Sequence, residues 1–132
     1  MAYATTNPYT GETLKTFPEA TDQEVQQAIT DAYEAFKSWR DGSFADRAKV
    51  MAAAGAILRR DIDKYAKLLT LEMGKLDEEA KRETILSAEI FEYYAKKAEE
   101  LLKPEKIPVA DPKEGGAIMI HKPQGIVCAM EP

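Results

Sequence analysis

The two side-chain types that most often activate a nucleophile or bind a transition metal are scarce in this sequence. Cys128 is the single cysteine and His121 the single histidine. Cys128 lies inside the apolar run 126–130, between Val127 and Ala129, and no histidine or helix start is near enough in sequence to activate its thiol. A free cysteine in such a run behaves as a small hydrophobic residue, so we predict a buried, inert thiol.

The other polar candidates also have simple structural interpretations. One histidine cannot form a histidine pair, and no thiolate cluster exists to bind a transition metal, so we expect His121 at a strand edge or on the surface. The pair Gly115-Gly116 precedes an expected strand, and no G-x-G-x-x-G sequence occurs, so this pair is not a phosphate-binding loop. Glu72 falls in the last turn of an expected helix, where the helix dipole disfavours a carboxylate; an exposed side chain is its simplest interpretation.

Composition restricts the function classes further. The chain of 132 residues is long enough for one domain with a core, and 45% hydrophobic with 31% charged residues is typical of a globular protein. The net charge of -5 and the absence of a basic run argue against a nucleic-acid or anionic-membrane partner. No secretory signal is recognisable at residues 1–5, and the longest apolar stretch, 51–58, is too short to cross a bilayer. With a single cysteine, these features predict a reducing, cytoplasmic location.

The elements that must position these side chains begin with a hairpin and continue with helices. Turn-forming residues 7–12 and a returning strand over 14–17 predict a β-hairpin, which Pro18 ends. Four amphipathic helices are then expected. The first begins at the N-cap Thr21, with Glu24 in a capping box, and ends at Asp41-Gly42; the second begins at the N-cap Ser43, with Asp46, and its apolar stripe reaches Leu58. The third begins at the N-cap Asp61 and ends at Gly74, and the fourth runs from about Asp77 to Lys103, where Pro104 closes it.

The fourth helix is apolar on more than one side. One stripe is made of small residues that allow close packing, and a second stripe contains Leu86, Ile90, Tyr93 and Leu101. We therefore expect other parts of the protein to cover it on both sides.

The tail after Pro104 is predicted to form strands, over 107–110 and 117–121. The run 126–130 has no polar alternation, which is typical of a strand buried on both faces of a parallel sheet. Such a strand needs neighbours that are reached by crossovers of a dozen or more residues, and the sequence given ends at Pro132. These features predict a fragment of a larger α/β protein.

Several strings, in this order, resemble the start of the aldehyde dehydrogenase superfamily. They cover nearly the whole chain, and their amino-acid sequences most resemble those of the bacterial succinate-semialdehyde dehydrogenase-like enzymes. The strings are Asn7-Pro8-Tyr9-Thr10-Gly11-Glu12; the helix with Val25, Ala28, Ala32, Phe36 and Trp39; Arg47 with 51–58; Leu71-Glu72-Met73-Gly74-Lys75; Tyr93-Tyr94-Ala95; and Pro123-Gln124-Gly125-Ile126-Val127 followed by Glu131-Pro132.

The resemblance implies an α/β fold in three parts: residues 1–104 as hairpin and helical part of the cofactor-binding domain, 105–123 as bridging strands that join subunits, and 124–132 as the first strand of the dinucleotide-binding sheet. It implies oxidation of a small aldehyde, such as succinate semialdehyde, with NAD or NADP as cofactor. The cysteine nucleophile, glutamate base and oxyanion-hole asparagine of the family match positions beyond Pro132, so no catalytic residue is expected in this chain, which alone is predicted to be inactive.

The resemblance also assigns candidate binding residues. Met130, Glu131 and Pro132 match a segment beside the nicotinamide half of the cofactor, and Leu86 matches a position lining the substrate tunnel. Glu72, with backbone carbonyls of Thr5 and Thr6, matches a possible monovalent-cation site, and hard cations do prefer oxygen ligands.

Three functions remain open at this point. The first is the N-terminal part of an aldehyde dehydrogenase, with an aldehyde as substrate, no nucleic-acid or membrane partner, and a homo-oligomeric assembly. The second is a non-catalytic helical interaction module that assembles with a full-length subunit. The third is a plain structural helical bundle. The DNA downstream of the Pro132 codon separates them, because an open frame continuing with Trp and Asn indicates a fragment.

Overall fold

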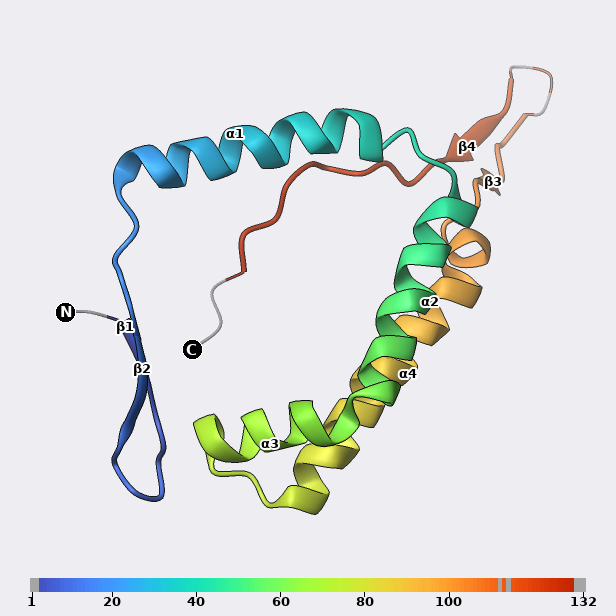
Figure 1. Cartoon of the computed structure of the whole chain (residues 1–132). Coiled ribbons are helices and arrows are strands. Elements are labelled where there is room, and N and C mark those ends of the chain that lie inside the picture. Colours follow the sequence, from blue (N-terminus) through green and yellow to red (C-terminus); the bar gives the residue numbers. More distant parts are fainter. Residues whose placement is uncertain (1–2, 112, 114, 130–132) are drawn as a thin grey trace.

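Four helices and two small antiparallel sheets make up the fold in a computed structural model that describes residues 3–111, 113 and 115–129 (Figure 1). In chain order the elements are β1 (Tyr3–Thr6), β2 (Thr13–Phe17), α1 (Asp22–Trp39), α2 (Phe44–Arg60), α3 (Ile62–Met73), α4 (Asp77–Leu101), β3 (Glu105–Ile107) and β4 (Ala117–Met119). The order agrees with the sequence-based prediction up to Leu101. The structure therefore confirms the hairpin and the four helices.

The hairpin is closed by the turn chemistry of residues 7–12. The Asn7 N–H donates to the Glu12 carbonyl (2.8 Å), and the Gly11 N–H donates to the Asn7 carbonyl (2.8 Å). The side-chain oxygen of Asn7 accepts a further hydrogen bond from the Tyr9 N–H (2.9 Å). Gly11 has a φ of 73°, a conformation that glycine adopts without steric cost.

Two of the three expected side-chain caps are confirmed. The Thr21 hydroxyl accepts from the Glu24 N–H, and the Glu24 carboxylate accepts from the Thr21 N–H (2.8 Å), which lowers the pKa of Glu24. Ser43 caps α2 by accepting from the Asp46 N–H (3.1 Å). The cap predicted for Asp61 is wrong: its carboxylate accepts two hydrogen bonds from the adjacent Arg60 guanidinium instead (2.9 and 2.7 Å). A nearby cation thus outcompetes the backbone N–H groups for this side chain.

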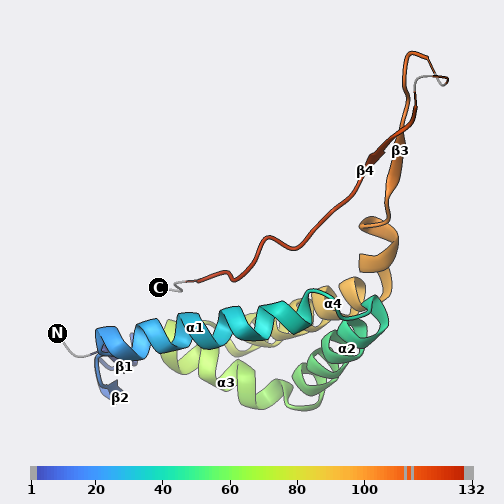
Figure 2. The same ribbon diagram turned by 90° about the horizontal axis from the view of Figure 1, so that it is seen from above.

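Helices α2 and α4 run side by side through small residues (Figures 1 and 2). Gly55 of α2 is buried, and a Cβ added there would lie 3.2 Å from the Ala88 carbonyl oxygen and 3.1 Å from Cγ of Glu92. Ala80, Thr84 and Ala88 are the buried residues of α4. One turn further along α2, Arg59 binds Glu92 through two hydrogen bonds (2.6 and 3.0 Å), which lower the pKa of Glu92. Because Gly55 has no side chain, it sets how closely α2 and α4 approach each other.

Helix α3 packs against the first half of α4 and its end meets the hairpin. Ala66 is its buried residue, and Lys81 of α4 reaches Asp63 at 3.5 Å. Gly74 ends α3 with a φ of 71°, as the sequence predicted, and a Cβ there would lie 3.1 Å from Cγ of Pro8. The same glycine therefore provides the helix end and the space for the hairpin.

Much of the apolar surface lacks cover. Helix α1 joins the hairpin to α2 (Figure 1), and none of its residues is buried. The second apolar stripe of α4 is exposed, with Leu86, Ile90 and Tyr93 between 49% and 55% accessible. The accessible surface is 11075 Å², whereas a folded monomer of this mass exposes about 7,000 Å². The expected cover on both sides of α4 is present on one side only.

The tail differs from the prediction. Strand β3 covers Glu105–Ile107 rather than 107–110, and β4 ends at Met119 rather than at 121. Residues 120–129 form no strand, so the structure does not confirm the first strand of a dinucleotide-binding sheet. A strand exists only when its N–H and C=O groups pair with a neighbour, and the described residues offer none here. Among those residues, no helix is long and apolar enough to span a membrane.

Amide hydrogen exchange is expected to differ between the packed helices and the tail. Amides in Ile62–Met73 and in 84–98 should exchange slowly, because α3 and α4 pack against one another, whereas amides after Pro123 should exchange fast, because residues 124–129 lack sheet partners. Mass-spectrometric exchange on the 132-residue chain measures both. Uniform protection through residue 129 would contradict this prediction.

Candidate functional site

The residues that the sequence assigned to the cofactor are Met130, Glu131 and Pro132, and all three lie outside the described residues. Leu86, assigned to a substrate tunnel, is 55% exposed. By helical periodicity it lies on the face of α4 opposite the buried Thr84 and Ala88, away from α2 and α3. Leu86 is therefore accessible to whatever covers that face, and its role in a tunnel stays a prediction.

The three residues of the predicted cation site lie on elements that the fold brings together. Thr5 and Thr6 belong to β1, and Glu72 belongs to the last turn of α3, which contacts β1. Glu72 is exposed, as its simplest interpretation required. No group of three His, Cys, Asp or Glu side chains that could hold a metal ion occurs within the described ranges. A site built from backbone carbonyls and one carboxylate stays a prediction.

The burial predicted for Cys128 is wrong in this structure. Its side chain is exposed, because the described residues contain no sheet against which 126–129 could pack. An exposed thiol alone is not a catalytic site, and no base or cation among the described residues is hydrogen-bonded to it.

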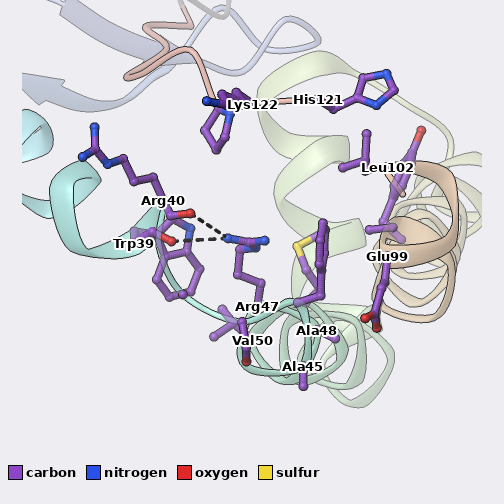
Figure 3. Close-up of a pocket in the computed structure, with 18 of the residues that line it drawn as sticks. Trp39, Arg40, Ala45, Arg47, Ala48, Val50, Glu99, Leu102, His121 and Lys122 are labelled. Atoms are coloured by element: carbon purple, nitrogen blue, oxygen red, sulfur yellow. Dashed lines mark hydrogen bonds between the residues drawn. The ribbon is translucent and has the colours of Figure 1, made fainter. Parts of the chain in front are cut away.

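A pocket lies where the end of α1, the start of α2 and the end of α4 meet the tail (Figure 3). We call it the corner pocket; its volume is about 900 Å³. Its lining residues come from these four segments, and they are Phe36, Trp39, Arg40, Gly42, Ser43, Phe44, Ala45, Arg47, Ala48, Val50, Met51, Tyr94, Ala95, Lys96, Ala98, Glu99, Leu102, His121, Lys122, Pro123 and Gly125. The sequence predicted each helix end but not that they would enclose a common space.

Arg47 is the residue that organises this corner. Its guanidinium points toward the end of α1 and donates weak hydrogen bonds to the carbonyls of Trp39 (3.4 Å) and Arg40 (3.5 Å), as Figure 3 shows. It also lies 4.6 Å from the centroid of the Phe44 ring. The last carbonyls of a helix lack intrahelical partners, so a cation there stabilises the helix end. Arg47 thereby connects the end of α1 to the start of α2.

Among the described residues that line the corner pocket, no hydrogen bond joins a nucleophile to a base. Ser43 Oγ donates to the Asp46 carboxylate (2.7 Å), but both side chains serve the start of α2. Hydrogen bonds from Ser43 and Lys49 lower the pKa of Asp46, which makes it a poor base. The arrangement suits binding rather than covalent chemistry.

The chain is similar to known proteins over its whole length. A sequence model of the aldehyde dehydrogenase family matches residues 1–132. The chain belongs to the aldehyde dehydrogenase family. This finding confirms the resemblance drawn from the ordered strings.

The proteins similar to this chain include several succinate-semialdehyde dehydrogenases. An NADP-dependent succinate-semialdehyde dehydrogenase of Deinococcus radiodurans is 41% identical over 130 residues, 98% of this chain and 27% of the relative. One from Mycobacterium leprae is 42% identical over 132 residues, 100% of this chain and 29% of the relative. The structure of succinic semialdehyde dehydrogenase from Streptococcus pyogenes, in complex with NADP+, superimposes with a TM-score of 0.83 at 39% identity, covering 90% of this chain and 26% of that one. The chain thus spans between a quarter and a third of the length of these relatives.

Proposed function

We propose that this chain is the N-terminal part of an NADP-dependent aldehyde dehydrogenase that oxidises succinate semialdehyde to the dicarboxylic acid. The observation that carries the proposal is the match over essentially the whole chain, at 41–42% identity, to enzymes named for this substrate and cofactor. The sequence alone left NAD and NADP open, and the names of these relatives favour NADP.

The chain on its own is proposed to be a scaffold rather than a catalyst. NADP+ would accept the hydride, and the resemblance assigns 130–132 to its nicotinamide half. In this proposal the nucleophilic cysteine, the general base and the oxyanion donor belong to sequence that aligns beyond Pro132. The described residues contribute packing surfaces, the exposed second apolar stripe of α4 with Leu86, and the proposed cation ligands where β1 meets α3.

Assembly and location extend the same proposal. The two-stranded sheet of β3 and β4 would be the bridging sheet that joins subunits of a cytoplasmic homo-oligomer. Its outer edges are unpaired among the described residues, which supports this role.

The second candidate function is the helical module that assembles with a full-length subunit. The accessible surface supports it, because it exceeds that of a typical monomer by several thousand Å². The open reading frame after the Pro132 codon distinguishes the two candidates: continuation with Trp and Asn favours the fragment, and a stop codon favours the module.

The activity test uses this chain alone and in a chimera. The purified 132-residue chain is expected to form no NADPH or NADH from succinate semialdehyde, because the part of the chain that the structure describes holds no nucleophile hydrogen-bonded to a base for this reaction. A chimera in which residues 1–132 replace the matched segment of the Mycobacterium leprae relative is expected to reduce NADP+ with succinate semialdehyde.

Two outcomes would contradict the proposal. A folded chimera that forms no NADPH would overturn the enzymatic assignment of this segment. Activity of the isolated chain that disappears in Cys128→Ala would instead show that Cys128 is a nucleophile.

A further inference from the structure

The corner pocket is cationic although the chain is acidic. Arg40, Arg47, Lys96 and Lys122 line it, against the single carboxylate of Glu99. The whole sequence has a net charge of -5, so this cluster runs counter to the average. A concave surface with one sign of charge favours a partner of the opposite sign.

Three of these four cations are poorly neutralised within the described residues, whereas Lys96 helps to lower the pKa of the nearby Glu92, after the larger effect of Arg59. Arg47 and Lys122 form no ion pair there, and Arg40 reaches only the exposed Asp41, at 3.5 Å. In Figure 3 Lys122 lies across the pocket from Arg47, on the tail segment. The carboxylates that would balance this charge are therefore expected from outside the described residues.

The walls between these charges are apolar and exposed. Trp39 is 50% and Val50 54% accessible, although both are large hydrophobic residues. Phe36, Phe44, Met51 and Leu102 complete the wall. An apolar wall with a cationic rim fits a surface that combines apolar side chains with carboxylates.

The area indicates that the occupant is a polypeptide. The accessible surface exceeds that of a typical monomer by about 4,000 Å², and a standard protein interface removes only about 800 Å² from each partner. This excess is spread over the whole chain, of which the corner pocket is one part, so a partner that covers it and also fills the pocket is a polypeptide. The chain spans 27–29% of the length of its relatives, and under the proposed function the remaining sequence of the enzyme would supply the cover.

We propose that the corner pocket is the docking site for an acidic, apolar polypeptide segment supplied by the catalytic remainder of the enzyme. This inference rests on the proposed function for the identity of the occupant. Arg47 and Lys122 would bind its carboxylates, and Trp39 and Val50 would pack against its apolar side chains.

Cysteine labelling of the Mycobacterium leprae chimera tests the docking independently of activity. With Cys128→Ser as background, Val50→Cys places a thiol in the pocket, and Lys49→Cys places one at a neighbouring position that is 77% exposed and does not line it. Maleimide labelling is read by peptide mass spectrometry and normalised to the rate in urea. Val50→Cys is expected to react about tenfold more slowly than Lys49→Cys.

Charge reversal tests the proposed recognition chemistry. Lys122→Glu is expected to raise the labelling of Val50→Cys severalfold, whereas Lys64→Glu, an exposed cation outside the pocket, should leave it unchanged. Arg47→Glu should act as Lys122→Glu does, but it also removes the bonds to the α1 carbonyls, so Lys122→Glu is the decisive variant.

The outcomes separate docking from function. Labelling of Val50→Cys as fast as that of Lys49→Cys overturns the docking proposal, whether or not the chimera is active. Equal effects of Lys122→Glu and Lys64→Glu overturn the role of charge. A protected pocket in a chimera that forms no NADPH supports docking and counts against the proposed function alone.

Discussion

Gly55→Val is expected to separate α2 from α4 and to unfold most of the helical region of the isolated chain. A Cβ at this position would already lie 3.1–3.5 Å from atoms of Glu92, Ala88 and Phe91. One of these atoms is a backbone carbonyl oxygen, which cannot rotate away, so the helices must move apart and lose packing along their contact. Overpacking of this kind costs about 1–3 kcal/mol, and such a loss is large against the marginal stability of small domains.

Circular dichroism during urea unfolding measures this effect on the 132-residue chain. Ala53→Val on the same helix is the matched control, because residue 53 is exposed and the new side chain meets only the small helix-propensity cost of a β-branched residue. Equal unfolding midpoints for the two variants would show that Gly55 does not set the helix separation.

Local signals predicted the helical elements well, because these elements are specified by nearby residues. The capping box of Thr21 and the left-handed glycine at Gly74 each depend on contacts within a few positions. Gly55 could not be recognised in this way, because its importance comes from Ala88, more than thirty residues away. Asp61 has the residue type of a cap but does not cap α3, because the adjacent Arg60 guanidinium binds its carboxylate instead.

The tail could not be predicted from its own sequence for a different reason. The apolar run around Cys128 describes the environment that a strand needs, but a strand also requires hydrogen-bonding neighbours, and none is present in the described residues. No local pattern predicts the corner pocket, because its lining comes from three stretches that are distant in sequence, 36–51, 94–102 and 121–125. No sequence signal marks Arg40, Arg47, Lys96 and Lys122, because they are four of 18 Lys and Arg residues spread along the chain.

The unpaired edges of the β3–β4 sheet are expected to make the purified chain self-associate. Strand β4 pairs with β3 in register, with Ile118 opposite Lys106, and each strand keeps one edge that is unpaired among the described residues. Ile118 and Ile120 are 56% and 55% exposed. An apolar strand with a free edge associates with other chains, and exposed helix faces add to this tendency, so we expect the purified chain to be dimeric or larger.

Ile118→Lys is therefore expected to shift the oligomer toward a 14.7 kDa monomer in light scattering, because it places a charge on the edge strand without touching the helical core. The new lysine would face Lys106, and like charges directly opposite each other weaken the β3–β4 pair as well. Ile118→Glu separates the two causes, since it charges the edge but pairs favourably with Lys106. If both variants are monomeric, the free edge of β4 drives association. If only Ile118→Lys is monomeric, its effect comes from the weakened β3–β4 pair. A clean monomer for the unaltered chain at high concentration would show that neither the sheet edge nor the exposed helix faces cause self-association.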